Sequence, residues 1–361
     1  MKPLLAYPNP IGLGASTVYP TIPEISTLTN RILGSPHHSC VSIGATLRME
    51  NPTLRVVNTE KNFVGRRELI MATVGSGKYT YEYVPNWAKM PAGQLMGTAS
   101  AVATDSQDRV YIFQRTNPPV LVFDREGNFL NSWGDGMFDD PHGIFIKDDI
   151  CYLTDREGSI AMKTTLDGTP LLSIGTRGEY SDTGCEKAGD VAPRSAGPFN
   201  YVTEMVPAPN GDLYISDGYR NARVHRFSAA GDLISSWGEP GKGGPNQFHL
   251  PHSLVVGDNG NVYLCDRENS RVQVFSPDGE YITMWTDMMR PLDISIDSEG
   301  IFYTSERPDD TNPAQISVLD GDGKVLERFP CISAHGSWVD AHGDLYLSLG
   351  AEKSVDKYVR I

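Results

Sequence analysis

The stretch Asn259–Phe275 (NGNVYLCDRENSRVQVF), followed by Pro277–Gly279 (PDG), decides the fold because its pattern recurs along the chain. It contains two short runs in which apolar and polar residues alternate, and Asn-Gly and Asp-Gly turns flank these runs. That combination is typical of antiparallel hairpins. Asn210–Ile215 (NGDLYI) and Val224–Phe227 (VHRF) repeat the same phrase earlier in the chain. A repeat length of about 40 residues indicates a propeller or a similar array.

The number of repeats follows from a tyrosine that marks the second expected strand of each unit. These tyrosines are Tyr111, Tyr152, Tyr214, Tyr263, Tyr303 and Tyr346. Four strands form one propeller blade, and closing the ring protects the sheet edges. The sequence therefore predicts an all-β, six-bladed propeller of four-stranded antiparallel blades. The last unit offers only three strands, so we expect the N-terminal strand Lys78–Val84 (KYTYEYV) to complete it and join the two ends of the ring.

The chain divides into two parts by composition. Residues 1–70 are rich in Pro, Ser and Thr and do not resemble the repeats, so we expect a poorly structured N-terminal extension. Residues 71–361 are expected to form the propeller. We also hypothesise that translation begins naturally at Met71, which leads directly into the N-terminal strand. A further segment, Thr176–Pro198, is inserted between the second and third units and is expected to shape the mouth of any site there.

Charge and composition exclude several classes of partner. The 361 residues carry a formal net charge of −14, which repels nucleic acids and anionic membranes. No stretch is apolar for long enough to span a membrane, and the N-terminus does not fit a secretory signal. The five cysteines lack paired spacing, which favours reduced thiols and a cytoplasmic protein. The oligomeric state is not predicted by these features.

Three histidines occupy one position of the repeat, in every second unit. They are His142, His252 and His335, and the units between them carry Ser100, Thr203 and Leu292 at this position. Alternate units of a six-membered ring lie about 120° apart, so the imidazoles are expected to converge on the axis. Three protein ligands and one open position form a catalytic zinc arrangement, although imidazole also suits Fe, Co, Ni and Cu. The alternative is that each histidine caps a strand through a backbone hydrogen bond.

A second position, four residues after the marker tyrosine, carries arginine in four of six units. In ring order the residues are Arg115, Arg156, Gly218, Arg267, Arg307 and Gly350. This position lies on the same face of a propeller as the start of the innermost strand, so the arginines are expected to surround the histidines. Guanidinium groups bind carboxylates bidentately, which predicts an anionic, carboxylate-bearing substrate. The alternative is that they pair with neighbouring Asp and Glu residues.

Tyr219 directly follows the glycine of this second position. Cationic neighbours favour the phenolate form of a tyrosine, and a phenolate can act as a base near neutral pH. We therefore regard Tyr219 as the candidate catalytic acid or base. An aromatic plug packed in the channel is the alternative interpretation.

Three phrases resemble the peptidyl-α-hydroxyglycine α-amidating lyase family, whose lyase domain is a six-bladed propeller of NHL-type repeats. They are Phe248–Leu254 (FHLPHSL), Asp266–Gln273 (DRENSRVQ) and Ser216–Val224 (SDGYRNARV), and the resemblance extends over about residues 75–361. It implies a zinc site at His142, His252 and His335, active-site arginines at Arg115 and Arg267, and a catalytic Tyr219. It also implies cleavage of a peptidyl-α-hydroxyglycine into an amide and glyoxylate.

The chain departs from this family in four respects. Gly336 replaces the aspartate that follows the family's third zinc histidine and helps to hold a structural calcium, so Ca²⁺ binding is doubtful here. The family's disulfides have no counterparts, and the monooxygenase domain of the bifunctional enzyme is missing from this sequence. Arg156 and Arg307 are additional arginines, which we expect to bind substrate.

We therefore predict a zinc-dependent carbon–nitrogen lyase that acts on a small or peptide-like α-hydroxyglycine carboxylate and releases an amide or amine and glyoxylate. A metal-dependent hydrolase of lactones or esters on the same fold is one alternative. A non-catalytic NHL module that binds proteins is the other. The fold by itself does not choose among the three.

Overall fold

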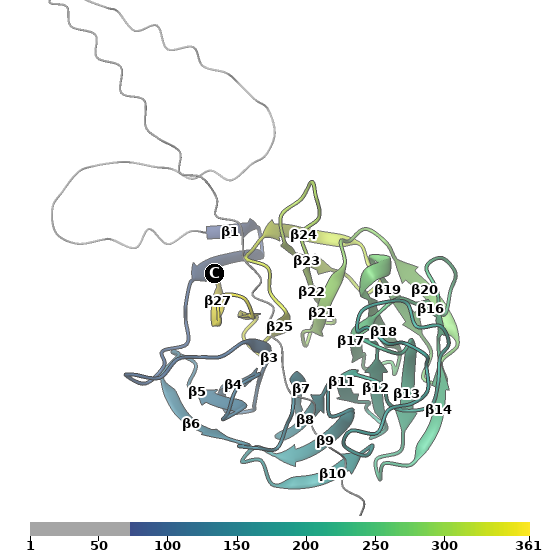
Figure 1. Ribbon diagram of the computed structural model, residues 1–361. Helices are drawn as coiled ribbons and strands as arrows, with labels where there is room; N and C mark the ends of the chain where they lie inside the picture. The colour runs from purple at the N-terminus through teal and green to yellow at the C-terminus, as the bar shows by residue number, and fades with distance from the viewer. Residues whose placement is uncertain (1–72) are drawn as a thin grey trace, which may run out of the picture. The chain divides into compact units, whose positions relative to one another are not determined.

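The computed structural model describes residues 73–361. The predictions made for residues 1–70 and for a start at Met71 lie outside the described residues. The described part is all-β, with a single 3-10 turn, η1 (Arg267–Asn269), as its helical element. Figure 1 shows the strands arranged as blades around a central axis. The predicted six-bladed propeller is confirmed.

The first three blades each contain four consecutive antiparallel strands. The first blade consists of β3 (Ala99–Thr104), β4 (Val110–Gln114), β5 (Val120–Phe123) and β6 (Phe129–Trp133). The second consists of β7 (Pro141–Lys147), β8 (Ile150–Asp155), β9 (Ile160–Thr165) and β10 (Pro170–Ile174). The third consists of β11 (Val202–Pro207), β12 (Leu213–Asp217), β13 (Arg223–Phe227) and β14 (Leu233–Trp237).

The next two blades repeat this order after a short parallel pair, β15 (Glu239–Pro240) and β16 (Gln247–Phe248). The fourth blade consists of β17 (Pro251–Val256), β18 (Val262–Asp266), β19 (Arg271–Phe275) and β20 (Tyr281–Trp285). The fifth consists of β21 (Pro291–Ile296), β22 (Phe302–Glu306), β23 (Gln315–Leu319) and β24 (Val325–Pro330).

The sixth blade is built from both ends of the described chain. Its inner strands are β25 (Gly336–Val339), β26 (Leu345–Leu349) and β27 (Ser354–Arg360). The N-terminal strand β2 (Tyr79–Val84) pairs with β27, with Tyr81 opposite Arg360, so the predicted closure is confirmed. The sequence did not predict the fifth strand, β1 (Thr73–Ser76), which pairs with β2 and extends the blade outward.

Hydrophobic side chains hold neighbouring blades together. One cluster joins Phe113 and Val120 of the first blade to Ile144 and Leu153 of the second. Each innermost strand contacts the innermost strand of the next blade, and β25 contacts β3 to close the ring. The six marker tyrosines all lie on second strands and are buried. Burying such large aromatic rings is a major source of stability.

A β-bulge lies at the histidine position of five innermost strands. The pairing with the second strand shifts register at Ser100, Thr203, His252 and Leu292, and over His142–Gly143. A bulge leaves one residue out of the ladder and re-aims its side chain. This position of the repeat is therefore the one from which side chains leave the sheet toward the axis.

Two further expectations concern the cysteines and the membrane. Within the described range, Cys151, Cys185, Cys265 and Cys331 are free thiols. No helix between residues 73 and 361 is long and apolar enough to cross a membrane. The cytoplasmic location stays a prediction.

Candidate metal centre and active site

The three histidines from alternate blades converge, as their spacing predicts. Their candidate ligand nitrogens all lie within 4.8 Å of one another. The ring centroids of His142, His252 and His335 are separated by 4.8, 4.9 and 5.0 Å. The three distances are nearly equal, so the imidazoles form an almost equilateral triangle around the axis.

Each imidazole is oriented by the backbone of the following blade. His142 Nδ1 donates to the Thr203 carbonyl over 2.8 Å, and His252 Nδ1 donates to the Leu292 carbonyl over 2.6 Å. His335 Nδ1 donates to the Ser100 carbonyl over 2.7 Å, which completes the circle. These acceptors stand at the same repeat position as the histidines. A hydrogen bond at Nδ1 leaves Nε2 as the ligand atom, as in many metal-bound histidines.

The charge state of the triangle also suits a metal. Burial lowers the pKa of His142 and His252 well below the usual range, helped by neighbouring histidines and arginines. Burial, with Arg115, lowers the pKa of His335 to about 3. The imidazoles are therefore neutral at physiological pH, which metal binding requires. His335 Nε2 is buried without a hydrogen-bond partner, so the donor set fits a transition-metal ion.

Tyr219 lies directly at the triangle. Its hydroxyl is 3.1 Å from His252 Nε2 and 3.4 Å from His142 Nε2. The centroid of the Tyr219 ring lies 4.7 Å from the Arg156 guanidinium and 5.6 Å from the Arg267 guanidinium. Tyr219 is thus placed where a group bound on the histidines and a carboxylate bound on the arginines would meet.

The third blade carries one extra residue, and this brings Tyr219 to the arginine position. In the four blades that carry an arginine here, the arginine amide bonds to the carbonyl two residues before the histidine position, as Arg267 does with Leu250. In the third blade the Tyr219 amide makes the equivalent bond, to Tyr201. Gly218 is the extra residue, and a Cβ there would lie only 2.1 Å from the Pro251 carbonyl oxygen. Gly218 stands four residues after the marker tyrosine, but Tyr219 is the structural counterpart of the arginines.

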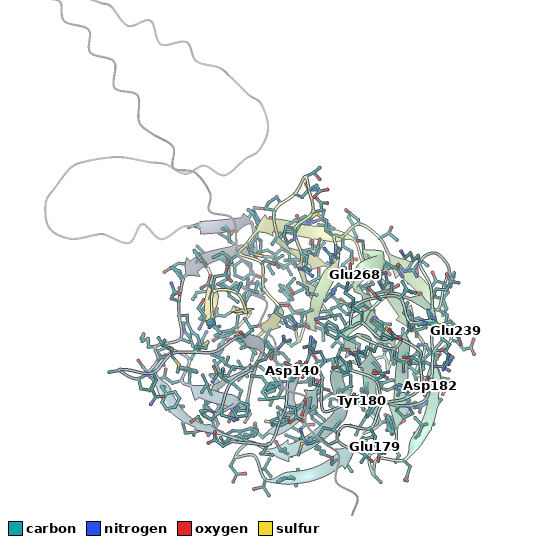
Figure 2. All side chains as sticks on the ribbon, viewed as in Figure 1. Asp140, Glu179, Tyr180, Asp182, Glu239 and Glu268 are labelled. Carbon is teal, nitrogen blue, oxygen red and sulfur yellow. The ribbon has the colours of Figure 1, made fainter. Side chains whose placement is uncertain are left out.

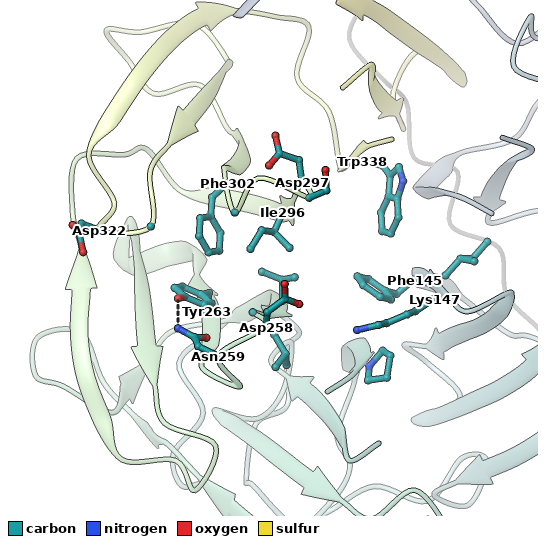
Figure 3. A pocket seen from close by; sticks show the side chains of 18 residues that line it. Phe145, Lys147, Asp258, Asn259, Tyr263, Ile296, Asp297, Phe302, Asp322 and Trp338 are labelled. Atoms are coloured by element: carbon teal, nitrogen blue, oxygen red, sulfur yellow. Dashed lines mark hydrogen bonds between the residues drawn. The ribbon is translucent and has the colours of Figure 1, made fainter. Parts of the chain in front are cut away.

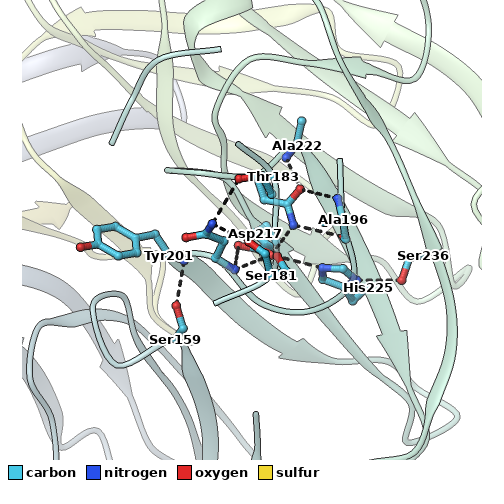
Figure 4. Close-up of polar contacts among 12 residues, drawn as sticks. Ser159, Ser181, Thr183, Ala196, Tyr201, Asp217, Ala222, His225 and Ser236 are labelled. Carbon is cyan, nitrogen blue, oxygen red and sulfur yellow. Dashed lines mark hydrogen bonds and ion pairs between the residues drawn. The ribbon is translucent and has the colours of Figure 1, made fainter. Parts of the chain in front are cut away.

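A buried carboxylate and the inserted segment hold the Tyr219 loop. Asp217 accepts hydrogen bonds from the Asn200 amide and from the Asn221 side chain, and it contacts His225 (Figure 4). From the inserted segment, the Gly189 amide donates to the Tyr219 carbonyl over 2.7 Å. The insertion therefore packs against the candidate catalytic loop.

The arginines form two groups, each paired with one carboxylate, Asp140 or Glu268, both labelled in Figure 2. Asp140 lies 3.1 Å from Arg115 Nε and 2.5 Å from Arg156 Nε, the latter without hydrogen-bond alignment. Glu268 lies 2.8 Å from Arg267 and 2.7 Å from Arg290. The expectation that some arginines pair with neighbouring acids holds for Arg267 with Glu268 and for Arg156 with Glu157. Asp140 is a partner that the sequence did not suggest.

Three carboxyl groups that directly precede these arginines in the sequence bind backbone amides. Asp155 accepts the backbone amides of Asp139 and Asp140, although it also pairs with Arg177. Asp266 and Glu306 likewise accept the amides of His249 and Met289. These three carboxyl groups hold the backbone just before β7, β17 and β21, three of the innermost strands in which the bulges lie.

Two acids that sequence reasoning missed lie below the histidine triangle. Glu204 and Asp293, together with the three histidines, line a small axial cavity with room for about one water molecule. Burial and the nearby Asp293 raise the pKa of Glu204 well above the usual range. Burial raises the pKa of Asp293 to about 6. Both follow the histidine position by one residue in histidine-free units, and this regular placement is the signal that could have found them.

Asp293 is expected to make stability depend on pH. Its folded pKa lies above the unfolded value, so its contribution is present below about pH 4 and is lost as the pH rises through about 6. The loss is on the order of 3 kcal/mol. We expect Asp293→Asn to raise the melting temperature of metal-free protein more at pH 8 than at pH 5. Thermal denaturation at both pH values checks this, with the exposed Asp232→Asn as control. An equal shift at both would contradict it.

Gly336 leaves no space for the family's calcium-binding aspartate. A Cβ at this position would lie 2.8 Å from the Ser100 carbonyl oxygen and 2.9 Å from Ala101 Cα. That same carbonyl orients His335. The departure noted in the sequence is therefore built into the packing between the sixth and first blades.

A larger cavity than the axial one lies elsewhere. It has a volume of about 610 Å³ and lies where the innermost strands end, lined by Phe145, Trp338, Asp258 and Asp297 among others (Figure 3). Neither the three histidines nor the arginines around them line it. Volume therefore does not locate the candidate chemistry, which depends on the converging polar groups at the other end of the same strands.

The fold and the histidine triangle define a class: six-bladed β-propellers with a three-histidine axial centre. A family model described as NHL repeat matches residues 248–275. The chain is similar to human NHL repeat-containing protein 3, with 32% identity over 58% of this chain and 61% of that protein. It is also similar to a probable peptidyl-alpha-hydroxyglycine alpha-amidating lyase of Caenorhabditis elegans, with 27% identity over 64% of this chain and 67% of that protein. The resemblance to amidating lyases is therefore confirmed as a similarity.

The extent of these matches limits what they carry. The chain spans only 61% and 55% of the human and mouse NHL repeat-containing protein 3. Among solved structures, a gluconolactonase from Xanthomonas campestris has a TM-score of 0.54 at 13% identity, over 78% of this chain and 89% of that one. At this identity the likeness concerns the fold alone.

Proposed function

We propose that the protein is a metal-dependent lyase that cleaves the carbon–nitrogen bond of an α-hydroxyglycine-type carboxylate, releasing an amide or amine and glyoxylate. The observation that carries this proposal is the convergence of three neutral imidazoles on one another, two of which contact the Tyr219 hydroxyl. Arg267 Nη1 lies 3.5 Å from that hydroxyl, and the Arg156 guanidinium faces the Tyr219 ring. The similarity to proteins named amidating lyases supports the same reaction class.

His142, His252 and His335 would hold the metal through Nε2, because their Nδ1 atoms are bonded to carbonyls. Zinc is our first choice, and other transition metals that accept imidazole fit the same donors. When bound, such an ion supplies a Lewis acid that acidifies a hydroxyl group in its open position.

The remaining steps belong to this chain's own side chains. Arg115 and Arg267 hold the substrate carboxylate and orient the α-carbon over the triangle, and Arg156 and Arg307 add positive charge around it. Tyr219, as the base, accepts the proton of the α-hydroxyl group. The carbon–oxygen bond becomes a carbonyl, the carbon–nitrogen bond breaks, and the nitrogen keeps its electron pair and takes up a proton. The guanidinium groups stabilise the negative charge that develops.

The proposal is tested by incubating the purified protein with an N-acyl-α-hydroxyglycine and measuring both products. We expect glyoxylate and amide in equal amounts, and about one zinc per chain by inductively coupled plasma mass spectrometry. Hydrolysis of lactones or esters without glyoxylate release would replace the lyase by the hydrolase alternative. No transition metal in the protein and no turnover would favour a binding module.

A further inference from the structure

The positive charge around the histidine triangle is unevenly distributed. On one side Arg115 and Arg156 share Asp140, with the exposed Glu157 3.5 Å from Arg156. On the other side Arg267 and Arg290 pair with Glu268, and Arg307 lies near enough to feel the charges of all three. We call these three arginines with Glu268 the Glu268 cluster. Two cations face two carboxylates on the first side, whereas three face one carboxylate in the Glu268 cluster.

The surplus in the Glu268 cluster has no counter-charge within the described chain. Arg267 and Arg290 both contact the same oxygen, Glu268 Oε1. Arg307 is partly buried and makes no ion pair with any residue between 73 and 361. The backbone amide nitrogen of Arg307 is 3.4 Å from the Arg290 carbonyl oxygen, so the backbone segments that carry these two residues are adjacent. Burial lowers the pKa of Arg307, and the nearby Arg267 and Arg290 lower it further, whereas Glu268 partly offsets them.

Unused hydrogen-bond donors accompany this charge. Arg290 Nε is buried and has no partner, and so is Arg115 Nη2 on the opposite side. A buried donor left without a partner costs free energy. A guanidinium group only donates, so these atoms call for an acceptor, and the surplus positive charge beside them favours an oxyanion.

One substrate carboxylate does not account for all of these groups. A carboxylate accepts about four hydrogen bonds, and the proposed contacts with Arg115 and Arg267 provide them. Arg290, which pairs with Glu268, and Arg307 remain. Since Arg267 serves the first carboxylate, the remaining surplus matches one additional negative charge.

On the basis of the proposed lyase function, we propose that the substrate is a dianion and that Arg290 and Arg307 bind a second carboxylate, carried by its amide or amine portion. The substrate class is then an α-hydroxyglycine derivative whose nitrogen substituent ends in a carboxylate. The bond broken and the proton transfers are unchanged, and the products are glyoxylate and a carboxylate-bearing amide or amine. A lyase that accepts any peptidyl-α-hydroxyglycine has no need of a second carboxylate, so this specificity would separate the protein from a general peptide-processing lyase.

The test compares two substrates that differ only at the second carboxylate: N-succinyl-α-hydroxyglycine and its terminal carboxamide. At constant ionic strength, we expect kcat/KM to be about 10- to 100-fold higher for the dicarboxylate, as for one charge-assisted pair of hydrogen bonds. Arg307→Gln should remove most of this preference. Lys324→Gln, which removes an exposed charge at the turn between β23 and β24 of the same blade, should retain it.

Equal kcat/KM for the two substrates in the wild type would overturn the dianion proposal and leave the lyase function intact. So would an Arg307→Gln variant that loses activity equally on both. If neither substrate is turned over, the proposed lyase function fails. The second carboxylate site is then tested separately, by measuring the binding of glutarate and of its monoamide with isothermal titration calorimetry. Tighter binding of glutarate, lost in Arg307→Gln, would support the second carboxylate site, and equal binding would overturn it.

Discussion

The His252→Ala variant is expected to purify without bound metal and to lose turnover by more than about 100-fold. Loss of a partner that only orients a ligand typically costs 10- to 100-fold, and removing one of three ligands should cost more. The His252 Nε2 atom points into the triangle, and its Nδ1 donates to Leu292. Elemental analysis and glyoxylate release measured on the same preparation check both parts of this prediction.

The control for this variant is another histidine. His342 is exposed, lies in the turn between β25 and β26 and contacts Asp108, not the triangle. His342→Ala should therefore keep the metal and the activity. Because His252 is buried, circular dichroism should confirm that the variant folds. Full activity in metal-depleted, folded His252→Ala protein would refute the metal mechanism.

The Tyr219→Phe variant is expected to keep its metal and lose about 100- to 10,000-fold in kcat, the usual contribution of a general acid or base. Phenylalanine keeps the ring that Arg156 and Arg267 face and removes only the hydroxyl near His142 and His252. KM should change much less than kcat, because the carboxylate contacts come from the arginines.

A neighbouring tyrosine provides the matched control for Tyr219. Tyr201 also lies under two guanidinium groups, those of Arg156 and Arg220. No hydrogen bond joins its hydroxyl to the histidines within the described residues. Tyr201→Phe should therefore leave kcat within a few-fold of the wild type. If Tyr219→Phe retained more than a tenth of the wild-type kcat, its hydroxyl would not be the base, and the aromatic-plug interpretation would gain support.

These two variants also separate the lyase from the hydrolase alternative. Both reactions require the histidines, so His252→Ala would abolish either one. A hydrolase that uses a metal-bound hydroxide has no requirement for a tyrosine base, so Tyr219→Phe would affect it less. The comparison with a gluconolactonase concerns the fold alone, and the arrangement around Tyr219 is the feature that favours the lyase.

Much of the architecture was predictable because it repeats. The marker tyrosines and the turn residues fix the length of each hairpin, and six units of the same kind bury their faces only by closing on one another. The strand Tyr79–Val84 was predictable because the last unit is one strand short. The strand Thr73–Ser76 was not predictable, because four residues at a sheet edge are too few to show an alternation of apolar and polar residues.

The candidate site was predictable in part. The histidines could be found because one residue type recurs at one repeat position, and ring symmetry turns that recurrence into proximity. Asp140 and Glu268 were not identified as the organisers of the arginines, because ion pairs depend on side-chain directions across blades. Glu204 and Asp293 were missed because the sequence does not distinguish a buried acid from an exposed one. Only the closed ring shows that both line the axial cavity.

The sequence by itself determined the number of blades, the strand that closes the ring and the residues that face the axis. This was possible because the repeated sequence defines each hairpin locally, and the symmetry of the ring brings residues at the same repeat position together. Only the tertiary structure decided which nitrogen each imidazole presents, that Tyr219 replaces an arginine in the third blade, and that Arg307 lacks a counter-charge. Those features depend on bulges, on one extra glycine and on contacts between different blades, and such contacts form only when the ring closes.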